Sequence, residues 1–228
     1  SGPGLIGGRA ALGILPPDAL DRRRADTGLT LAEHITRCGG DPAAIAPGRR
    51  LLPAGPIRCF LEAHIEQAPS LIEAGIPLAV CTGIPGNIRH AAIRITGEDA
   101  HVGLPRRFRQ DAALAGADLF TALDTLWAEE EAAGRPMAAT IGRFHTDTTK
   151  HEITVVAGDF TLSLDLRAYD AAHLAALEQR LHAIVAEVAM RRGVTIELGP
   201  RNAAPVGPCD PALQRGLADA AARAGIAT

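Results

Sequence analysis

The stretch Asp159-Phe-Thr-Leu-Ser-Leu-Asp-Leu-Arg-Ala168 carries the clearest structural signal in the chain. Apolar and polar side chains alternate along it without interruption. The apolar set is Phe160, Leu162, Leu164 and Leu166, and the polar set is Thr161, Ser163, Asp165 and Arg167. Because successive side chains of a strand point to opposite faces of a sheet, this pattern predicts a strand with one buried and one polar face.

The segments on either side of this strand alternate between helical and strand patterns. A helix is predicted over 171–192, because Asp170 can cap its start and Gly193 is a typical stop. A second helix is predicted over 111–133, and further strands over 89–98, 138–144, 152–156 and 194–198. The order over 89–198 is therefore β-α-β-β-α-β or close to it. That order is typical of a ferredoxin-like α+β domain, an antiparallel sheet with two helices on one face.

The outer segments read as a second, interrupted domain. Apolar runs predict buried strands over 57–65 and 76–81, and a terminal helix is predicted over 211–224. Thr30 and Glu33 have the spacing of a capping box, which predicts a helix over 31–38. Gly and Pro residues within 82–87 indicate a domain boundary. The sequence thus predicts an α/β domain over 1–86 and 202–228, interrupted by an inserted domain over 87–201.

Composition excludes some classes of protein. The 228-residue chain has a net charge of -3 and only 3% aromatic residues, which argues against binding to nucleic acid. No apolar run approaches the roughly 18 residues of a membrane span, and no signal peptide is recognisable. The four cysteines lack the close spacing of a zinc or redox motif, so free thiols in a reducing, cytoplasmic compartment are predicted.

The stretch Phe60-Leu-Glu-Ala-His-Ile-Glu-Gln-Ala-Pro69 holds a candidate metal ligand. In an extended strand, Glu62, His64 and Glu66 would share one face. A histidine flanked by carboxylates is a plausible metal ligand. A solvated polar face with an incidental histidine also fits the spacing, and both interpretations stay open on spacing alone.

Several motifs in order give the chain a family resemblance. They are Leu61-Glu-Ala-His-Ile-Glu-Gln-Ala-Pro-Ser-Leu71, Cys81-Thr-Gly-Ile-Pro-Gly86, Gly97-Glu-Asp-Ala-His-Val-Gly103, Arg109-Gln-Asp-Ala112 and Leu164-Asp-Leu-Arg167. Together they resemble the hydantoinase/carbamoylase family of zinc-type amidohydrolases, which includes N-carbamoyl-L-amino acid hydrolases, allantoate amidohydrolases and β-ureidopropionases. The resemblance covers nearly the whole chain. It implies a catalytic domain that binds two divalent metals, and an inserted domain that dimerises and closes over the site.

The resemblance also implies roles for individual residues. His64 matches a metal ligand and Gln67 a substrate contact. His101 matches the histidine that reaches the neighbouring subunit's site to stabilise the tetrahedral intermediate, as a hydrogen-bond donor can. Arg167 matches the arginine that binds the substrate carboxylate through two points. The residues alone leave two alternatives: Arg167 in a surface ion pair with Asp165, and His101 as an ordinary loop histidine.

Three departures from the family pattern bear on activity. Thr154 stands where the family has a substrate-binding Asn, and Ala68 where it has Gly. The run after His101, Val102-Gly-Leu-Pro-Arg-Arg107, adds two arginines that could shift preference toward more anionic substrates. The family places most metal ligands and its general base upstream of Ser1 and downstream of Thr228. The chain is therefore expected to be truncated at both ends, to bind little or no metal and to be inactive alone.

The expected function is metal-dependent hydrolysis of a non-peptide C–N bond in an N-carbamoyl amino acid, allantoate or a similar ureido or acyl-amide substrate. The complete protein would use a divalent metal, Zn or else Mn, Ni or Co. A homodimer through 87–201 is expected. The alternative is a non-catalytic homologue that dimerises or binds a ligand.

Overall fold

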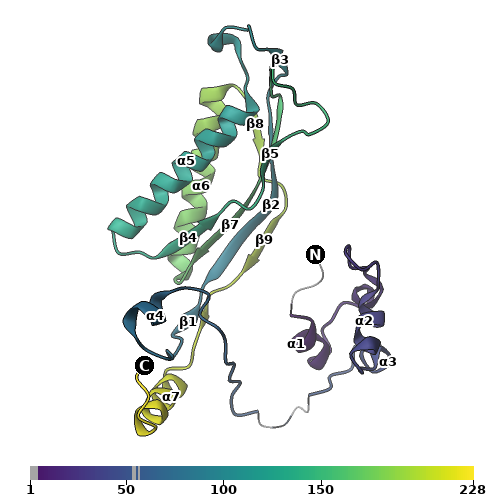
Figure 1. The fold of residues 1–228 in the computed structure, drawn as a ribbon, viewed down its shortest axis with the longest axis vertical. Helices are drawn as coiled ribbons and strands as arrows, with labels where there is room; N and C mark the ends of the chain where they lie inside the picture. The colour runs from purple at the N-terminus through teal and green to yellow at the C-terminus, as the bar shows by residue number, and fades with distance from the viewer. Residues whose placement is uncertain (1–4, 53–54, 56) are drawn as a thin grey trace. The chain divides into compact units, whose positions relative to one another are not determined.

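The structure, a computed structural model, describes residues 5–52, 55 and 57–228. The chain divides into two compact units, Ser1–Ile65 and Glu66–Thr228, which are described separately. Figure 1 shows the helices and strands of each unit.

The first unit contains only short helices among its described residues. They are α1 (Ile6–Ala11), η1 (Pro17–Asp21), α2 (Leu31–Arg37) and α3 (Pro42–Ile45). The predicted capping box is confirmed, since the Glu33 N–H donates to Thr30 Oγ1 at 3.1 Å and the Thr30 N–H donates to Glu33 Oε2 at 2.7 Å. A small apolar cluster holds the unit together: Ala10, Leu15, Ala19 and Leu20.

The two strands predicted before residue 82 are wrong. Residues 57–65 and 76–81 form no strand, and Phe60 and Ile65 are 80% and 76% exposed. A strand requires a neighbour to pair its backbone N–H and C=O groups. Within the described part of the chain, no segment pairs with either run. An apolar run indicates that its side chains tend to be buried, but it does not indicate whether another segment is available to pair with it as a strand.

The second unit is built on a six-stranded antiparallel sheet. Its strands are β2 (Gly86–Thr96), β4 (Met137–Thr140), β5 (Phe144–Thr146), β7 (Asp159–Ala168), β8 (Thr195–Glu197) and β9 (Arg201–Ala204). The order is β4-β7-β2-β8, with β5 also pairing with β7 and β9 with β2. Helices α5 (Ala112–Ala132) and α6 (Ala171–Arg192) lie side by side on one face of this sheet (Figure 1). The predicted β-α-β-β-α-β order is therefore confirmed.

The central strand β7 has the predicted bounds and the predicted alternation. All four apolar side chains named for it are at most 4% exposed. They pack with Ile93 and Ile95 of β2 and with leucines of both helices. Burying one such side chain contributes roughly 1.5–3 kcal/mol, so this layer dominates the stability of the sheet. The caps of α6 are also as predicted: Asp170 accepts from the His173 N–H at 2.7 Å, and Gly193 ends the helix at φ 67°.

Both edges of the sheet are interrupted. The strand predicted over 138–144 is broken between β4 and β5, and β9 continues along β2 where β8 ends. The strand predicted over 152–156 is reduced to β6 (Val155–Val156), which pairs with β3 (Ala100–His101). Short elements complete the unit: α4 (Ser70–Ala74), β1 (Gly83–Ile84), η2 (Arg106–Phe108), β10 (Gly207–Pro208) and α7 (Pro211–Arg223). In the described part of the chain, no helix is long and apolar enough to cross a bilayer.

One buried carboxylate joins the two long helices. Glu130 of α5 is 6% exposed and accepts hydrogen bonds from Arg135 Nε at 2.6 Å and His173 Nε2 at 2.8 Å. The Arg135 guanidinium is the main reason that the pKa of Glu130 is lowered from 4.5 to about 2, with His173 adding to it. A carboxyl with a lowered pKa stabilises the fold above its ordinary value, and this contribution disappears as the pH falls from 4.5 through about 2.

We expect Glu130→Gln to lower the free energy of unfolding by about 1–3 kcal/mol at pH 7, because it removes charge-assisted hydrogen bonds from a buried site. The difference from the wild type should shrink below pH 4.5 and vanish near pH 2. Urea unfolding across this pH range measures it. Glu129→Gln is the matched control, since Glu129 makes an exposed pair with Arg180; it should change stability by less than about 0.5 kcal/mol. Equal effects of the two variants would contradict the prediction.

Candidate functional site

His101 lies in a short ladder at one end of the sheet unit. It belongs to β3, opposite Val155 of β6, and its Nδ1 accepts a hydrogen bond from the Gly103 N–H at 3.1 Å. The side chain is exposed. Because Nδ1 accepts, a neutral His101 ring carries its proton on Nε2. The histidine therefore presents an N–H donor to solvent, which is the group that oxyanion stabilisation requires.

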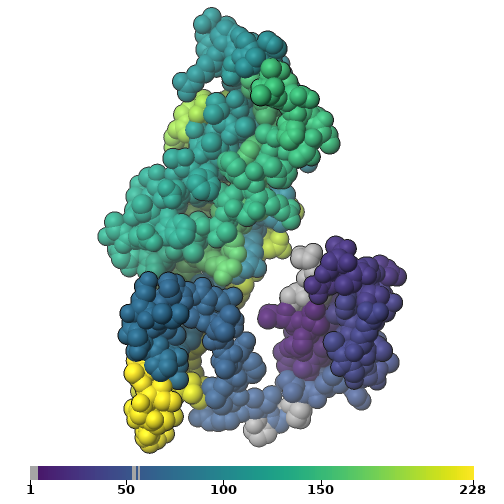
Figure 2. Space-filling model, viewed as in Figure 1, coloured from purple at the N-terminus to yellow at the C-terminus, as the bar shows by residue number. Residues whose placement is uncertain are grey.

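Thr154 lies beside this histidine. The Val102 N–H donates to the Thr154 carbonyl oxygen at 2.8 Å, which joins the two segments next to the β3–β6 pair. Figure 2 shows the residues near 100–110 in teal and those near 145–155 in green, side by side at the end of the unit. The structure thus brings together His101 and Thr154, two of the residues predicted for the site.

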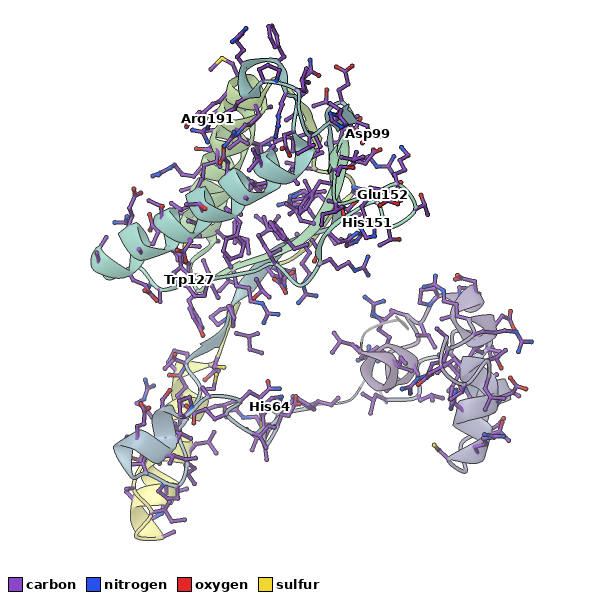
Figure 3. The ribbon with its side chains drawn as sticks, turned by 45° about the horizontal axis from the view of Figure 1, so that its top comes forward. His64, Asp99, Trp127, His151, Glu152 and Arg191 are labelled. Carbon is purple, nitrogen blue, oxygen red and sulfur yellow. The ribbon has the colours of Figure 1, made fainter. Side chains whose placement is uncertain are left out.

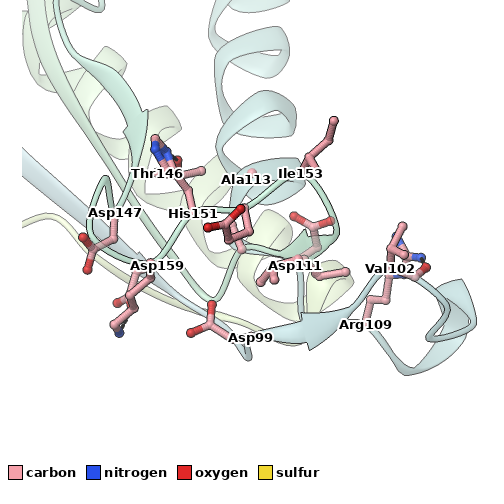
Figure 4. Close-up of a pocket in the computed structure, with 15 residues that line it drawn as sticks. Asp99, Val102, Arg109, Asp111, Ala113, Thr146, Asp147, His151, Ile153 and Asp159 are labelled. Carbon is pink, nitrogen blue, oxygen red and sulfur yellow. Dashed lines mark hydrogen bonds and ion pairs between the residues drawn. The ribbon is translucent and has the colours of Figure 1, made fainter.

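A depression of about 580 Å³ adjoins this ladder (Figure 4). Several acidic side chains line it, and three of them have structural partners. Asp99 accepts from the Gly158 N–H at 2.6 Å, Asp111 caps α5 and Asp159 pairs with Lys150 at 2.8 Å. In the residues that the structure describes, no group of three or more His, Cys, Asp or Glu side chains could hold a metal ion. The three pairs hold the loops around the depression, and we assign it no ligand.

Arg109 holds the loop that follows His101. Its Nε donates to the Leu104 carbonyl at 2.7 Å, and its Nη2 donates to the Val102 carbonyl. The Leu104 N–H in turn donates to the His101 carbonyl at 2.9 Å. One guanidinium thus spans two carbonyls of the loop that carries the histidine. The sequence placed Arg109 in a family motif but gave it no role, because these contacts depend on how the loop folds.

We expect Arg109→Lys to loosen this loop, since an ammonium is a point charge that cannot span two carbonyls with the fixed geometry of a guanidinium. The amides of Gly103 and Leu104 should exchange with solvent at least about fivefold faster. Hydrogen exchange followed by NMR measures this directly. Arg107→Lys is the control, because Arg107 stacks on Phe108. Unchanged protection of both amides in Arg109→Lys would show that the loop is held by other contacts.

Arg167 lies on the polar face of the sheet. It donates to Asp165 through Nη2 at 2.8 Å and Nε at 3.2 Å, and Arg89 of β2 donates to the same carboxylate at 2.9 Å. Burial raises the pKa of Asp165, but the two guanidinium groups outweigh it and leave the pKa below its ordinary value. The ion pair that the sequence offered as an alternative is therefore present. A carboxylate ligand would have to share Arg167 with Asp165 or replace it.

His101 and Arg167 lie toward opposite ends of the unit. Figure 3 places Asp99, His151 and Glu152 at the end that carries β3, and Trp127 toward the other end. Trp127 packs against the cluster that contains Leu166 and Ala168, the neighbours of Arg167. From Asp159 to Arg167 the strand rises roughly 26 Å, at about 3.3 Å per residue. One chain therefore cannot place both side chains on one small substrate.

Gln67 and His64 are exposed residues outside any helix or strand. Gln67, in the second unit, has φ 63°, a left-handed conformation that is uncommon for a residue with a side chain. His64, in the first unit, bonds through Nδ1 to the Ile65 carbonyl (labelled in Figure 3). The donor set of the described residues does not fit a two-metal centre, because His64 would supply a single ligand.

Comparison with known proteins identifies the family. Residues 86–192 match the peptidase dimerisation domain. The chain is 34% identical, over 72% of its length, to an N-carbamoyl-L-amino acid amidohydrolase of Geobacillus stearothermophilus, and 31% identical, over 86%, to one of Paenarthrobacter aurescens. A hydantoinase/carbamoylase family amidase from Burkholderia ambifaria superposes on 98% of the chain, with 34% identity and a TM-score of 0.77.

The chain belongs to the hydantoinase/carbamoylase family. The family fold is an α/β domain with an inserted dimerisation domain, and the sheet and the two long helices described above form that insertion. The chain spans 39% and 46% of the length of the two curated relatives and 52% of the Burkholderia chain.

Proposed function

We propose that the protein containing this chain is a metal-dependent amidohydrolase that cleaves a non-peptide C–N bond in an N-carbamoyl amino acid, allantoate or a similar ureido or acyl-amide substrate. The names of the relatives support this choice, since they include carbamoyl amino acid amidohydrolases and a probable allantoate deiminase of Oryza sativa, 27% identical over 91% of this chain. The structural observation that carries the proposal is the placement of His101 and Arg167 at opposite ends of a dimerisation domain.

In the proposed site, Arg167 binds the carboxylate of the substrate. Its guanidinium already holds the two oxygens of Asp165, so its fork is presented in the orientation that a carboxylate accepts. Arg89 can retain Asp165 when Arg167 turns to the substrate, because it contacts the same carboxylate at 2.9 Å. Gln67 is proposed as a further substrate contact.

His101 is proposed to act in the site of the partner subunit of a homodimer formed through residues 87–201. Its Nε2–H would donate to the oxygen of the carbonyl under attack as negative charge develops there. Thr154 is proposed to reach the same substrate from the neighbouring segment. Its single hydroxyl offers fewer hydrogen bonds than the Asn of the family pattern, which narrows the polar groups that it can recognise.

The metal is proposed for the whole protein. His64 is proposed as one ligand of a divalent ion, Zn or else Mn, Ni or Co, with residues 1–86 and 202–228 as part of the domain that binds it. Because the described residues do not complete such a centre, no step of the reaction is assigned to a metal.

The test measures hydrolysis by the full-length protein, loaded with Zn²⁺ or Mn²⁺. The substrates are N-carbamoyl-L-amino acids, allantoate and the matching N-alkylureas, which keep the carbamoyl group but lack the carboxylate. We expect turnover of the carboxylate-bearing compounds. Loss of the carboxylate should lower kcat/KM at least about 30-fold, because it removes the charge partner of the Arg167 guanidinium. Tight binding of these compounds without turnover would contradict the proposal and favour the non-catalytic, ligand-binding alternative.

A further inference from the structure

The sheet domain is entered and left through two short strands that lie side by side. Gly83 and Ile84 of β1 pair with Pro208 and Gly207 of β10. A cysteine flanks each strand: Cys81 precedes β1, and Cys209 follows β10 directly. The Cys209 N–H donates to the Thr82 carbonyl at 3.1 Å, which continues the pairing by one residue and sets Cys209 next to Cys81.

Three further hydrogen bonds hold this segment in place. The Cys81 thiol donates to the Gly83 carbonyl at 3.1 Å, so it folds along the paired segment. Gln214 of α7 donates through Nε2 to the carbonyls of Cys209 and Thr82, at 2.8 and 3.4 Å. Burial raises the pKa of Cys209, and the Cys81 thiol, which is close enough to hydrogen-bond with it, adds to this effect.

The Cα spacing fits a disulfide if the chain turns at Cys81, since residues one position out of register in a regular strand pair point to opposite faces. Cys81 lies outside β1, and its thiol already turns to the Gly83 carbonyl. Opposed residues of an antiparallel pair are about 5.5 Å apart and the strand rises about 3.4 Å per residue, which puts diagonal neighbours at roughly 6.5 Å. Disulfides occur at Cα separations of about 4.4–6.8 Å. Cys81 is exposed and Cys209 is half-buried, so an oxidant can reach the pair.

We propose that Cys81 and Cys209 are an oxidisable dithiol that closes to an intramolecular disulfide across the base of the sheet domain. With hydrogen peroxide, the Cys81 thiolate attacks a peroxide oxygen, becomes a sulfenic acid and releases the first water. The Cys209 sulfur then attacks the Cys81 sulfur, the S–S bond forms and the second water leaves. The two thiols lose two electrons, and the peroxide is reduced to two molecules of water.

The disulfide would covalently join the two connections of the domain. Each connection is otherwise held by a two-residue strand, so the clamp would restrict bending at this point while leaving the sheet unchanged. This inference is independent of the proposed activity, because neither cysteine belongs to the site described above.

The experiment uses the whole chain with Cys38→Ser and Cys59→Ser, which removes the two exposed cysteines of the first unit. The protein is treated with hydrogen peroxide, quenched with N-ethylmaleimide and digested for peptide mass spectrometry. We expect a peptide pair joined through Cys81 and Cys209, a loss of two hydrogens per chain, and full reversal by a dithiol reductant. Chains joined only to one another, or both thiols recovered as maleimide adducts, would overturn the proposal.

A second variant tests whether the oxidation of Cys209 depends on Cys81. Adding Cys81→Ser should slow the loss of the Cys209 thiol at least tenfold, since Cys209 then lacks its partner. Circular dichroism checks that the variant is folded. Loss of the Cys209 thiol at an unchanged rate would also overturn the proposal, because it would mean that Cys209 reacts alone.

Discussion

Replacing His101 with Ala is expected to lower kcat of the full-length protein by about 10²–10³-fold, which is the usual effect of removing one oxyanion donor. The fold should be unaffected, because the His101 side chain is exposed and, among the described residues, hydrogen-bonds only with the Gly103 N–H. His145→Ala is the matched control, since His145 is another exposed histidine of the same domain. Steady-state kinetics on the best substrate of the panel measures both variants. Equal activity of His101→Ala and the wild type would remove His101 from the site.

The same variant tests whether the site is shared between subunits. Arg167→Ala should also be nearly inactive, with kcat/KM lowered by about 30- to 1,000-fold. If His101 and Arg167 serve one site from different subunits, a hybrid of the two variants has one site with both residues intact. Random mixing makes about half of the dimers hybrid, each with one intact site of two, so about a quarter of the wild-type activity should return.

This complementation has a clear negative outcome. Two residues that act in the same subunit cannot complement, and the mixture would stay as inactive as its components. A mixture of His101→Ala with Arg94→Ala serves as a control, because Arg94 lies on β2 opposite Thr161 of β7 and takes no part in the proposed site.

Gly97→Ala is expected to destabilise the sheet domain strongly. A Cβ at this position would lie 1.9 Å from the Gln110 carbonyl oxygen, which is backbone and cannot turn away. The same contact region carries two hydrogen bonds, from the Gly97 N–H to Gly158 at 2.7 Å and from the Glu98 N–H to Gln110 at 2.9 Å. We expect the free energy of unfolding to fall by roughly 3 kcal/mol, which corresponds to a fall of about 6–12 °C in Tm.

Gly216→Ala is the matched control for this effect. Gly216 lies within α7, and among the described residues a Cβ there would meet nothing within 4 Å beyond its chain neighbours and the backbone of its own helix. Because Ala favours a helix over Gly by about 1 kcal/mol, this variant should be neutral or slightly more stable. If the Tm values of Gly97→Ala and Gly216→Ala differ by less than about 2 °C, the expected clash is contradicted. A difference of that size corresponds to no more than about 1 kcal/mol in the free energy of unfolding.

The sequence predicted the sheet domain well because its signals are local. Alternation along β7 and the caps of α6 at Asp170 and Gly193 depend only on neighbours in the chain, and all three are confirmed. The strand predicted over 57–65 failed because a strand depends on a partner that composition does not reveal. A local pattern therefore predicts where a strand or helix can form, but a strand forms only where another segment pairs with it, as β2 does with β7.

The candidate site shows the same division. The ion pair of Arg167 with Asp165 could be predicted, because side chains two positions apart on one strand point to the same face of the sheet. The proximity of Thr154 to His101 was not, since it arises from the long-range pairing of β3 with β6. The contact of Arg89 with Asp165 could not be predicted for a similar reason, because it follows from the register of β2 against β7. The roles of His64, Gln67, His101, Thr154 and Arg167 stay predictions, and the variants above test two of them directly.

The interrupted edges of the sheet also protect the protein from aggregation. An unbroken edge strand offers a row of free N–H and C=O groups that can capture a strand from another chain. Here each edge is shared by two strands of three or four residues, β4 with β5 and β8 with β9. A foreign strand can form only a few bonds before it meets the gap. The long central strands β2 and β7, whose buried faces form much of the apolar core, are thereby kept out of reach of templated growth.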